Sequence, residues 1–294
     1  MNGAKKTLVA AVDQTRASQE AFDQAMILAL SMRAKLTAVS VMPRFEGNMD
    51  LLKVSNAHEL LRQPFEEALR EAAQKAASRG IEVETVLAEG DPSDGIVGAA
   101  EQSQAGMIIL GNKRRNHMER VLVGSTAART IGKSPCDVLL IPQGTVVDFR
   151  RIVAAVDGSK YSMAAAQRAL DLALSYGGEL FALSVLDVPV ERTLIYGVLE
   201  DARGKALAAL KSLGKQGETF GVKATAEIRE GTPYKVIAEY AEEVDAGLVC
   251  LGTFGKTGLR RLLMGSVVER ALVLSPCPVL VVKQLGEDGV RDFV

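Results

Sequence analysis

Apolar and polar positions along this chain follow two alternating periods, and the whole alternation occurs twice. Short β-branched apolar runs, typical of buried parallel strands, are separated by longer stretches with apolar residues at helical spacing. The predicted strands are residues 8–12, 36–41, 82–88, 107–110 and 138–141, and then 152–156, 180–186, 223–229, 248–251 and 279–282. The predicted helices are 18–32, 59–79, 92–102 and 125–131, and then 162–176, 199–218, 233–243 and 266–274. This order predicts an α/β protein with two doubly wound, five-stranded parallel sheets.

The two halves of the chain repeat each other in sequence. The run TLVAAVDQT at residues 7–15 corresponds to RIVAAVDGS at 151–159, and the tripeptide SPC occurs at 134–136 and again at 275–277. A length of 294 residues fits two domains of about 150 residues each. We therefore predict a first domain at residues 1–145, a second domain at 149–284 and a polar tail at 285–294.

Composition narrows the class of protein. A net charge of −1 and an aromatic content of 4% without tryptophan argue against a nucleic-acid partner. No apolar run approaches the length of a membrane span, and no apolar segment typical of a signal peptide precedes the first strand, so we expect a cytoplasmic protein with no membrane partner. Three cysteines without a CxxC pair and only two histidines predict no metal site built from protein side chains.

A glycine-rich stretch at residues 247–266 is the main candidate for chemistry. Gly252 and Gly255 are separated by two residues, Gly265 follows after nine more, and Ser266 opens an apolar helical run. Glycines let backbone amides approach an anion closely, and a helix N-terminus offers unpaired N–H groups and a positive dipole. The layout therefore predicts a phosphate cradle.

The ends of the predicted strands extend this candidate site. In a doubly wound sheet, ligands bind beyond the carboxyl ends of the strands, where the strand order reverses. If the first strand of the second half lies beside the fourth, Asp157 and Gly252 face one crevice. Asp157 would then accept hydrogen bonds from a ribose hydroxyl or a base amine, and Val185, at the end of the second strand, would contact a base. Gly265 and Ser266 would offer N–H groups and a hydroxyl to a phosphate.

The usual catalytic motifs are missing from the sequence. There is no GxxxxGK[ST] loop, no GxGxxG after the first strand, and no histidine in the second half for a Ser-His-Asp set. No general base is evident, so we predict no catalytic residues and expect binding rather than catalysis.

At these residues the sequence resembles the universal stress protein family, in a tandem form with two such domains over residues 5–283. The ATP-binding members carry G-x2-G-x9-G-[ST], and Gly252, Gly255, Gly265 and Ser266 match every position. The resemblance implies sheets with strand order 3-2-1-4-5, in the fold type called adenine nucleotide alpha-hydrolase-like.

The resemblance also implies a ligand. It implies ATP or AMP with adenine near Asp157 and Val185, ribose near Gly252, and phosphates over Gly255, Gly265 and Ser266. Mg or Mn would accompany a triphosphate. The implied function is an adenine-nucleotide-binding protein of stress response or energy sensing. Two alternatives stay open, namely a slow ATP hydrolase or phosphotransferase, and a protein-interaction scaffold with vestigial pockets.

Family members dimerise by pairing their fifth strands. The resemblance therefore implies that residues 138–141 and 279–282 pair within one chain, as a pseudo-dimer without exposed sheet edges at those strands. Association of two chains into a homodimer is a further expectation. The protein partner is not indicated by the sequence.

The first half departs from the motif at its second glycine, where Arg114 stands. The other positions of this possible degenerate site are kept, namely Asp13, Val41, Gly111, Gly124 and Ser125. In one interpretation Arg114 closes the crevice and the half is a structural partner. In the other, the forked guanidinium of Arg114 reaches a phosphate directly. We favour the first, because the loop conformation that suits glycine often needs a positive φ.

Overall fold

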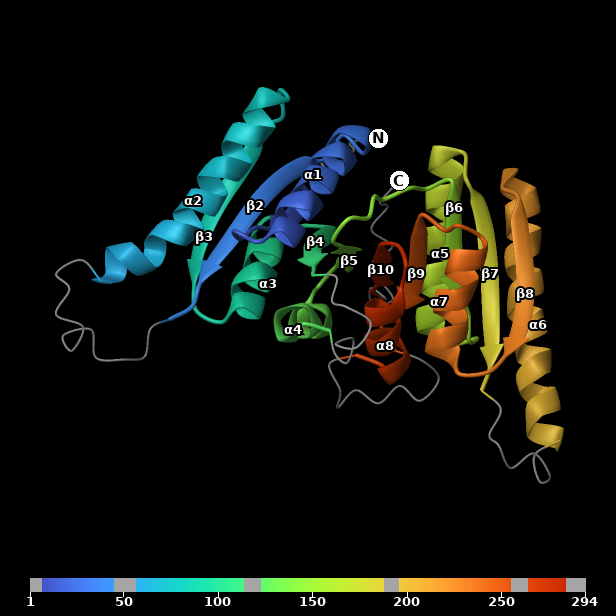
Figure 1. Cartoon of the computed structure of the whole chain (residues 1–294). Helices are drawn as coiled ribbons and strands as arrows, with labels where there is room; N and C mark the ends of the chain where they lie inside the picture. Colours follow the sequence, from blue (N-terminus) through green and yellow to red (C-terminus); the bar gives the residue numbers. More distant parts are fainter. Residues whose placement is uncertain (1–6, 45–56, 114–122, 188–195, 255–263, 284–294) are drawn as a thin grey trace. The chain divides into compact units, whose positions relative to one another are not determined.

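Figure 1 shows a computed structural model of the chain, in which the structure describes residues 7–44, 57–113, 123–187, 196–254 and 264–283. The chain forms two compact units that divide between Gly144 and Thr145. Each unit is described by itself below. The predicted tail at residues 285–294 lies outside the described residues.

The first unit is a doubly wound α/β sheet. Its elements are β1 (Thr7–Ala11), α1 (Arg16–Ser31), β2 (Lys35–Met42), α2 (Ala57–Ser78), β3 (Val83–Glu89), α3 (Pro92–Gln102), β4 (Met107–Asn112), α4 (Ser125–Lys133) and β5 (Asp137–Pro142). The strands are parallel and lie in the order β3-β2-β1-β4-β5. This confirms the predicted order 3-2-1-4-5.

The second unit repeats this arrangement. Its elements are β6 (Arg151–Ala155), α5 (Lys160–Tyr176), β7 (Glu179–Leu186), α6 (Tyr196–Phe220), β8 (Ala224–Glu230), α7 (Pro233–Glu243), β9 (Leu248–Gly252), α8 (Ser266–Leu274) and β10 (Val279–Val282). The strands are again parallel, in the order β8-β7-β6-β9-β10. The order reverses between β6 and β9, as it does between β1 and β4 in the first unit.

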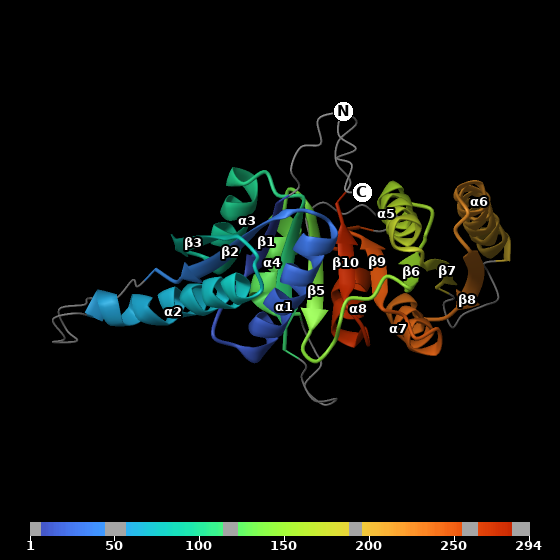
Figure 2. The same ribbon diagram turned by 90° about the horizontal axis from the view of Figure 1, so that it is seen from above.

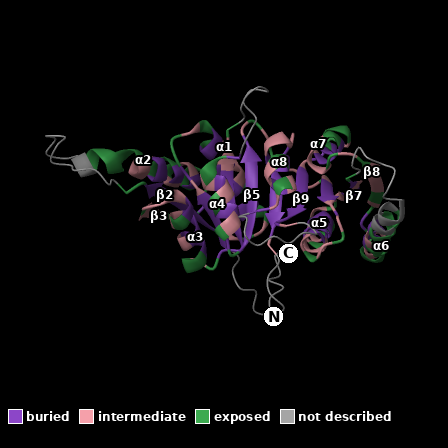
Figure 3. Cartoon of the chain, turned by 90° about the horizontal axis from the view of Figure 1, so that it is seen from below, coloured by how far each residue is buried: buried purple, intermediate pink, exposed green. Residues whose placement is uncertain are grey.

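Helices cover both faces of each sheet, because a right-handed crossover on either side of the first strand leads to opposite faces. Figure 2 shows α1 and α2 on one face of the first sheet and α3 on the other, and α5 and α6 opposite α7 and α8 in the second unit. The strands between these layers carry the core, which is coloured as buried in Figure 3. Leu8 and Val9 in β1, and Ile152 and Val153 in β6, are fully buried.

The boundaries follow local chemistry. Pro92 and Pro233 begin α3 and α7 at the position where a missing N–H is tolerated. Gly80 and Gly221 stop the chain after α2 and α6 with positive φ values of 68° and 72°. Since Gly221 comes only after Phe220, α6 runs two residues beyond the predicted end at 218.

Candidate functional site

A cavity of about 350 Å³ lies in the second unit at the carboxyl ends of the strands. Its lining includes five of the six residues predicted for the nucleotide site: Asp157, Val185, Gly252, Gly265 and Ser266. The sixth, Gly255, lies outside the described residues. The ends of β6, β7 and β9 and the start of α8, which are far apart in sequence, therefore lie around one cavity, at the point where the strand order reverses.

The turn after β6 fixes Asp157. The Asp157 N–H donates to Ser162 Oγ at 3.2 Å, and Asp157 Oδ1 accepts from the Ser159 N–H at 2.9 Å. Between them, Gly158 has φ +81°, a conformation that favours glycine. Ser159 also caps α5 by accepting from the Ser162 N–H at 3.1 Å. The carboxylate is thus held at the cavity by the first turn of α5.

Helix α8 starts at the same cavity, which its first residue, Ser266, lines. Gly265 is its N-cap, and glycine has no side chain, so the first turn of α8 receives no side-chain cap from its N-cap residue. The Gly265 N–H itself donates to the Thr253 carbonyl at 3.1 Å. Thr253 is in turn anchored, because its Oγ1 donates to the Val282 carbonyl at 3.0 Å. Of the two N–H groups expected from sequence, that of Gly265 is therefore engaged, while Ser266, Val267 and Val268 of the first turn of α8 line the cavity.

Gly252 has a packing role in addition to lining the cavity. A Cβ on Gly252 would stand 2.5 Å from the carbonyl carbon of Tyr161 and 2.8 Å from the Ser162 nitrogen. No side chain fits there without moving the start of α5. The sequence pattern assigned this glycine to close approach of a ligand, and the structure adds this close approach between β9 and α5.

Several lining residues were not predicted from the sequence. The cavity is also bounded by Ser162, Asp187, Pro233, Ile237 and Phe254. The signal for the residues of α7 was present, since a helix that follows a parallel strand begins at the edge where ligands bind. Phe254 stands between the two motif glycines, and its ring meets that of Tyr161 edge to face at 5.5 Å. Among them, Pro233, Ile237 and Phe254 give the cavity an apolar wall.

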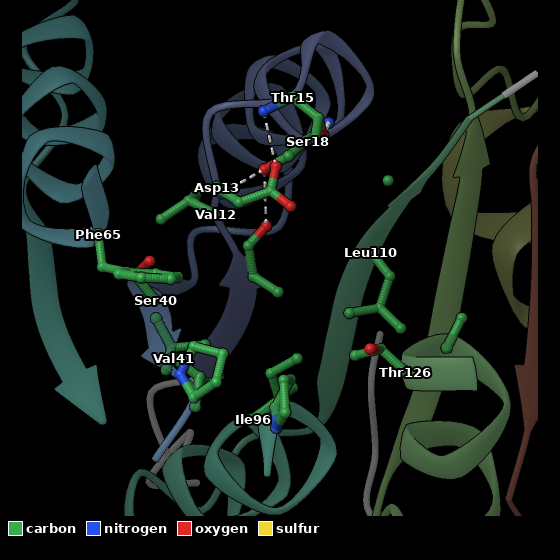
Figure 4. A pocket seen from close by; sticks show the side chains of 16 residues that line it. Val12, Asp13, Thr15, Ser18, Ser40, Val41, Phe65, Ile96, Leu110 and Thr126 are labelled. Carbon is green, nitrogen blue, oxygen red and sulfur yellow. Dashed lines mark hydrogen bonds between the residues drawn. The ribbon is translucent and has the colours of Figure 1, made fainter. Parts of the chain in front are cut away.

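The first unit also contains a cavity, of about 270 Å³, at the equivalent place (Figure 4). Asp13, Val41 and Gly111 line it as predicted. Gly124 and Ser125 do not, because the first turn of α4 presents Thr126 and Ala127 to the cavity instead. The assignment of those two residues to a site in this crevice stays a prediction, and Arg114 lies outside the described residues.

The strand-end turn is built alike in both units. The Asp13 N–H donates to Ser18 Oγ at 2.8 Å, and Asp13 Oδ1 accepts from the Thr15 N–H at 2.8 Å. Gly111 is again forced by packing, since a Cβ would lie 2.3 Å from the Ala17 carbonyl oxygen. The turn after β1 and the end of β4 therefore match the turn after β6 and the end of β9.

In the part of the chain that the structure describes, no group of three or more His, Cys, Asp or Glu side chains is arranged to hold a metal ion. Among the same residues, no helix has the length and apolar character needed to cross a membrane.

The comparisons with known proteins agree with this architecture. The model of the Universal stress protein family matches the chain twice, at residues 5–142 and 148–283. A universal stress protein of Methanocaldococcus jannaschii is 41% identical over 144 residues, covering 46% of this chain and 83% of that protein. A universal stress protein E homolog of Haemophilus influenzae is 25% identical over 277 residues, covering 87% and 89%.

A solved structure shares the fold over almost the whole chain. It is a universal stress protein from Archaeoglobus fulgidus, with a TM-score of 0.75 at 23% identity, and the alignment covers 94% of this chain and 98% of that one. Both halves match the family model, and the fold of each unit is the one expected. The chain therefore belongs to the universal stress protein family, as a tandem member with two copies of the domain.

Proposed function

We propose that the second unit binds an adenine nucleotide, ATP or AMP, and that the protein acts in stress response or energy sensing through this binding. The observation that carries the proposal is the single cavity that gathers Asp157, Val185, Gly252 and the first turn of α8. Its volume of about 350 Å³ falls in the range of small-molecule sites. The lining includes a fixed carboxylate and a helix N-terminus.

Each of these two features suits one part of a nucleotide. The Asp157 carboxylate accepts hydrogen bonds from a ribose hydroxyl or a base amine, which are donors. Ile237 and Phe254, with Val185, form the apolar wall against which a base packs. The Ser266 hydroxyl and the uncapped amides of α8 donate to a phosphate, and the helix dipole favours its negative charge.

A divalent ion would enter this site with the triphosphate. Magnesium keeps several of its waters and is commonly bound through substrate phosphates rather than by a protein cage. The described residues fit that mode, since they offer no cluster of three or more His, Cys, Asp or Glu ligands. Mg or Mn is thus proposed only as a companion of ATP.

The lining supports binding more than hydrolysis. Phosphoryl transfer needs cations that stabilise the charge of the transition state. Among the described residues around the cavity there is no lysine, arginine or histidine. Two alternatives remain. Slow ATP hydrolysis is tested by incubating the purified protein with ATP and magnesium or manganese. The other alternative is a protein-interaction scaffold whose cavities bind no ligand.

Isothermal titration of the full chain with ATP and AMP tests the proposal. We expect saturable binding that Asp157→Ala weakens at least tenfold, because the carboxylate is lost. Gly255→Arg, which copies the residue of the first half into the second, is expected to weaken ATP binding as well. Asp13→Ala is the matched control in the first unit and should leave ATP binding unchanged.

The proposal fails if neither nucleotide binds, or if Asp157→Ala and Asp13→Ala have the same effect. Mass spectrometry of the denatured protein adds a second readout, because a nucleotide carried through purification would be released. Pairing of residues 138–141 with 279–282 and formation of a homodimer stay predictions. Sedimentation equilibrium of the full chain tests the homodimer.

A further inference from the structure

Helices α2 and α6 hold the same place in the two units, but their charged side chains are arranged differently. The lysine and arginine residues of α2 all meet a carboxylate, in the pairs Arg62–Glu66, Arg70–Glu67 and Lys75–Asp23. On α6, Arg203, Lys211 and Lys215 are exposed, and none of them forms an ion pair with another residue that the structure describes. Since residues 202–217 contain no Asp or Glu, this stretch of α6 carries a surplus of positive charge.

Two of these lysines lie on one side of α6. Lys211 and Lys215 are four residues apart, which places them about 6 Å from each other along the helix axis. Leu207, one turn before Lys211, is 54% exposed and adds an apolar surface. We call these three residues the basic face; the exposed side of α6 is green in Figure 3. Exposed positions beside it are small, namely Gly204, Ala208 and Ser212, so another surface can approach closely.

The edge strands β3 and β8 differ in the opposite sense. In β8, Glu227 meets a cation within the unit, because Arg229 pairs with it at 2.8 Å. At the start of β3, Glu82 and Glu84 are exposed, and neither pairs with a cation among the described residues. Residues 80–90 contain no Lys or Arg. We call Glu82 and Glu84 the acidic edge, and it carries a surplus of negative charge.

The acidic edge matches the basic face in spacing as well as in sign. Residues two apart on a strand point to the same side and are about 6–7 Å apart. The two glutamates therefore have nearly the same spacing along the backbone as the two lysines. Opposite charges at matching positions steer association and fix its register. A nucleic acid or an acidic protein would account for the basic face alone, whereas a second copy of this chain accounts for both surfaces.

We propose that two copies of this chain associate through the basic face of one copy and the acidic edge of the other. Lys211 and Lys215 pair with Glu82 and Glu84 of the second copy, and the contact covers Leu207. Because the two surfaces differ, the contact is heterologous, and each copy offers one surface of each kind. The contact is separate from the predicted pairing of fifth strands, and it does not depend on nucleotide binding by the second unit.

Sedimentation velocity of the full chain at low and high salt tests this contact. The Debye length falls from about 30 Å at 0.01 M salt to about 3 Å at 1 M, so an association held by exposed charges is screened at the higher value. We expect self-association at low salt and its loss at high salt. The chain carrying Lys211→Glu and Lys215→Glu should associate at least tenfold more weakly at low salt, because like charges then face each other.

A charge exchange identifies the two surfaces as partners. The chain carrying Glu82→Lys and Glu84→Lys should also lose self-association. An equimolar mixture of the two charge-reversed chains should associate at low salt although neither does so alone, because each surface again meets its opposite. All four positions are exposed, so circular dichroism and the unfolding midpoint should stay those of the wild type.

The matched control makes the same change of net charge elsewhere. Lys35→Glu with Lys235→Glu alters two exposed lysines outside the basic face and should leave association unchanged. The proposal is overturned if the wild type does not associate at low salt, or if its association is unaffected by Lys211→Glu with Lys215→Glu. It is also overturned if the control weakens association equally, which would make net charge the cause, or if the mixture stays unassociated, which would assign the basic face to another acidic partner.

Discussion

Gly252 at the end of β9 lies directly against Tyr161 at the start of α5, at a distance that leaves no room for a Cβ atom. The same relationship joins Gly111 to Ala17 in the first unit. The first glycine of the motif therefore lets a strand end touch a helix start in both units. Gly252 and Gly111 also line the cavities of their units, so the contact lies beside both cavities.

Gly252→Ala is expected to destabilise the protein by about 1–3 kcal/mol, because the new methyl group forces α5 away from β9. Chemical denaturation should show a lower unfolding midpoint. Gly124→Ala is the control, since a Cβ there meets no atom of the described residues within 4 Å, and its effect should stay within about 0.5 kcal/mol. Equal unfolding midpoints for the two variants would contradict the packing role of Gly252. Because Gly252→Ala also disturbs packing, weaker ligand binding by this variant does not by itself establish that Gly252 contacts the ligand.

The fold was largely predictable from the sequence, because each element carries its own signal. Buried strands such as 107–110 are continuous apolar runs, and helices such as 233–243 begin at a proline and end where the apolar period ends. The strand order came from resemblance to a family, since spacing alone leaves the neighbours of each strand undetermined. Because the two halves repeat each other, each strand or helix predicted in one half could be compared with its counterpart in the other.

The cavities were only partly predictable. Asp157 and Gly252 stand at strand ends, where topology places ligands, so a sequence argument reaches them. The positions of Ser40 and Phe65 in the lining of the first cavity depend on how α2 packs over β2. That is a property of three-dimensional packing, and no local pattern encodes it.

Arg33 is a strained position that offers a test of backbone conformation. Its φ is +51°, and the equivalent residue of the second unit is Gly177, with φ +66° at the end of α5. A side chain in the left-handed region destabilises the folded chain by about 1–2 kcal/mol, and glycine relieves this strain. Glycine also raises the entropy of the unfolded chain, which offsets part of the gain. Arg33→Gly should therefore stabilise the protein by about 0.5–1 kcal/mol in urea denaturation. The reverse change, Gly177→Arg, should destabilise it, and a lower midpoint for Arg33→Gly would refute the argument.

The starts of α3 and α7 differ in their caps. Asp91 caps α3 and accepts from the Ser93 N–H at 2.9 Å, whereas Thr232 makes no side-chain cap bond to α7. Aspartate is among the best N-cap residues, so Thr232→Asp should stabilise the protein by about 0.5–1 kcal/mol. Arg270 stands at the position of Arg129, which pairs with Asp91 at 2.8 Å. In the structure Arg270 donates to the Tyr234 hydroxyl at 3.1 Å, and its positive charge would favour an aspartate at position 232.

Urea denaturation at neutral pH measures this change. Thr232→Asn is a control that caps without charge, and it should recover part of the gain, since only the aspartate also complements the helix dipole and Arg270. Asp91→Ala should lower stability in the first unit. A fall in stability for both Thr232→Asp and Thr232→Asn would show that a side chain at position 232 cannot accept hydrogen bonds from the first amides of α7.

Stability should fall at alkaline pH because two acids of the second unit are buried. Burial raises the pKa of the Cys277 thiol from 9.0 to about 11 and that of the Tyr240 hydroxyl from 10.0 to about 12. The unfolded chain loses these protons first, so the stabilisation is complete below pH 9 and is lost from pH 9 to 11 for Cys277 and from pH 10 to 12 for Tyr240. Each proton contributes a slope of about 1.4 kcal/mol per pH unit within its window.

Urea midpoints measured from pH 8 to 11 test this dependence. Cys277→Ala removes the first titration, so its stability should decline less steeply than that of the wild type between pH 9 and 10, whatever its absolute value. Tyr240→Phe should keep the decline that begins near pH 9 and lose the part that begins near pH 10. Parallel profiles for the wild type and Cys277→Ala would mean that the thiol titrates alike in the folded and unfolded chains, and would therefore rule out the proposed effect of burial.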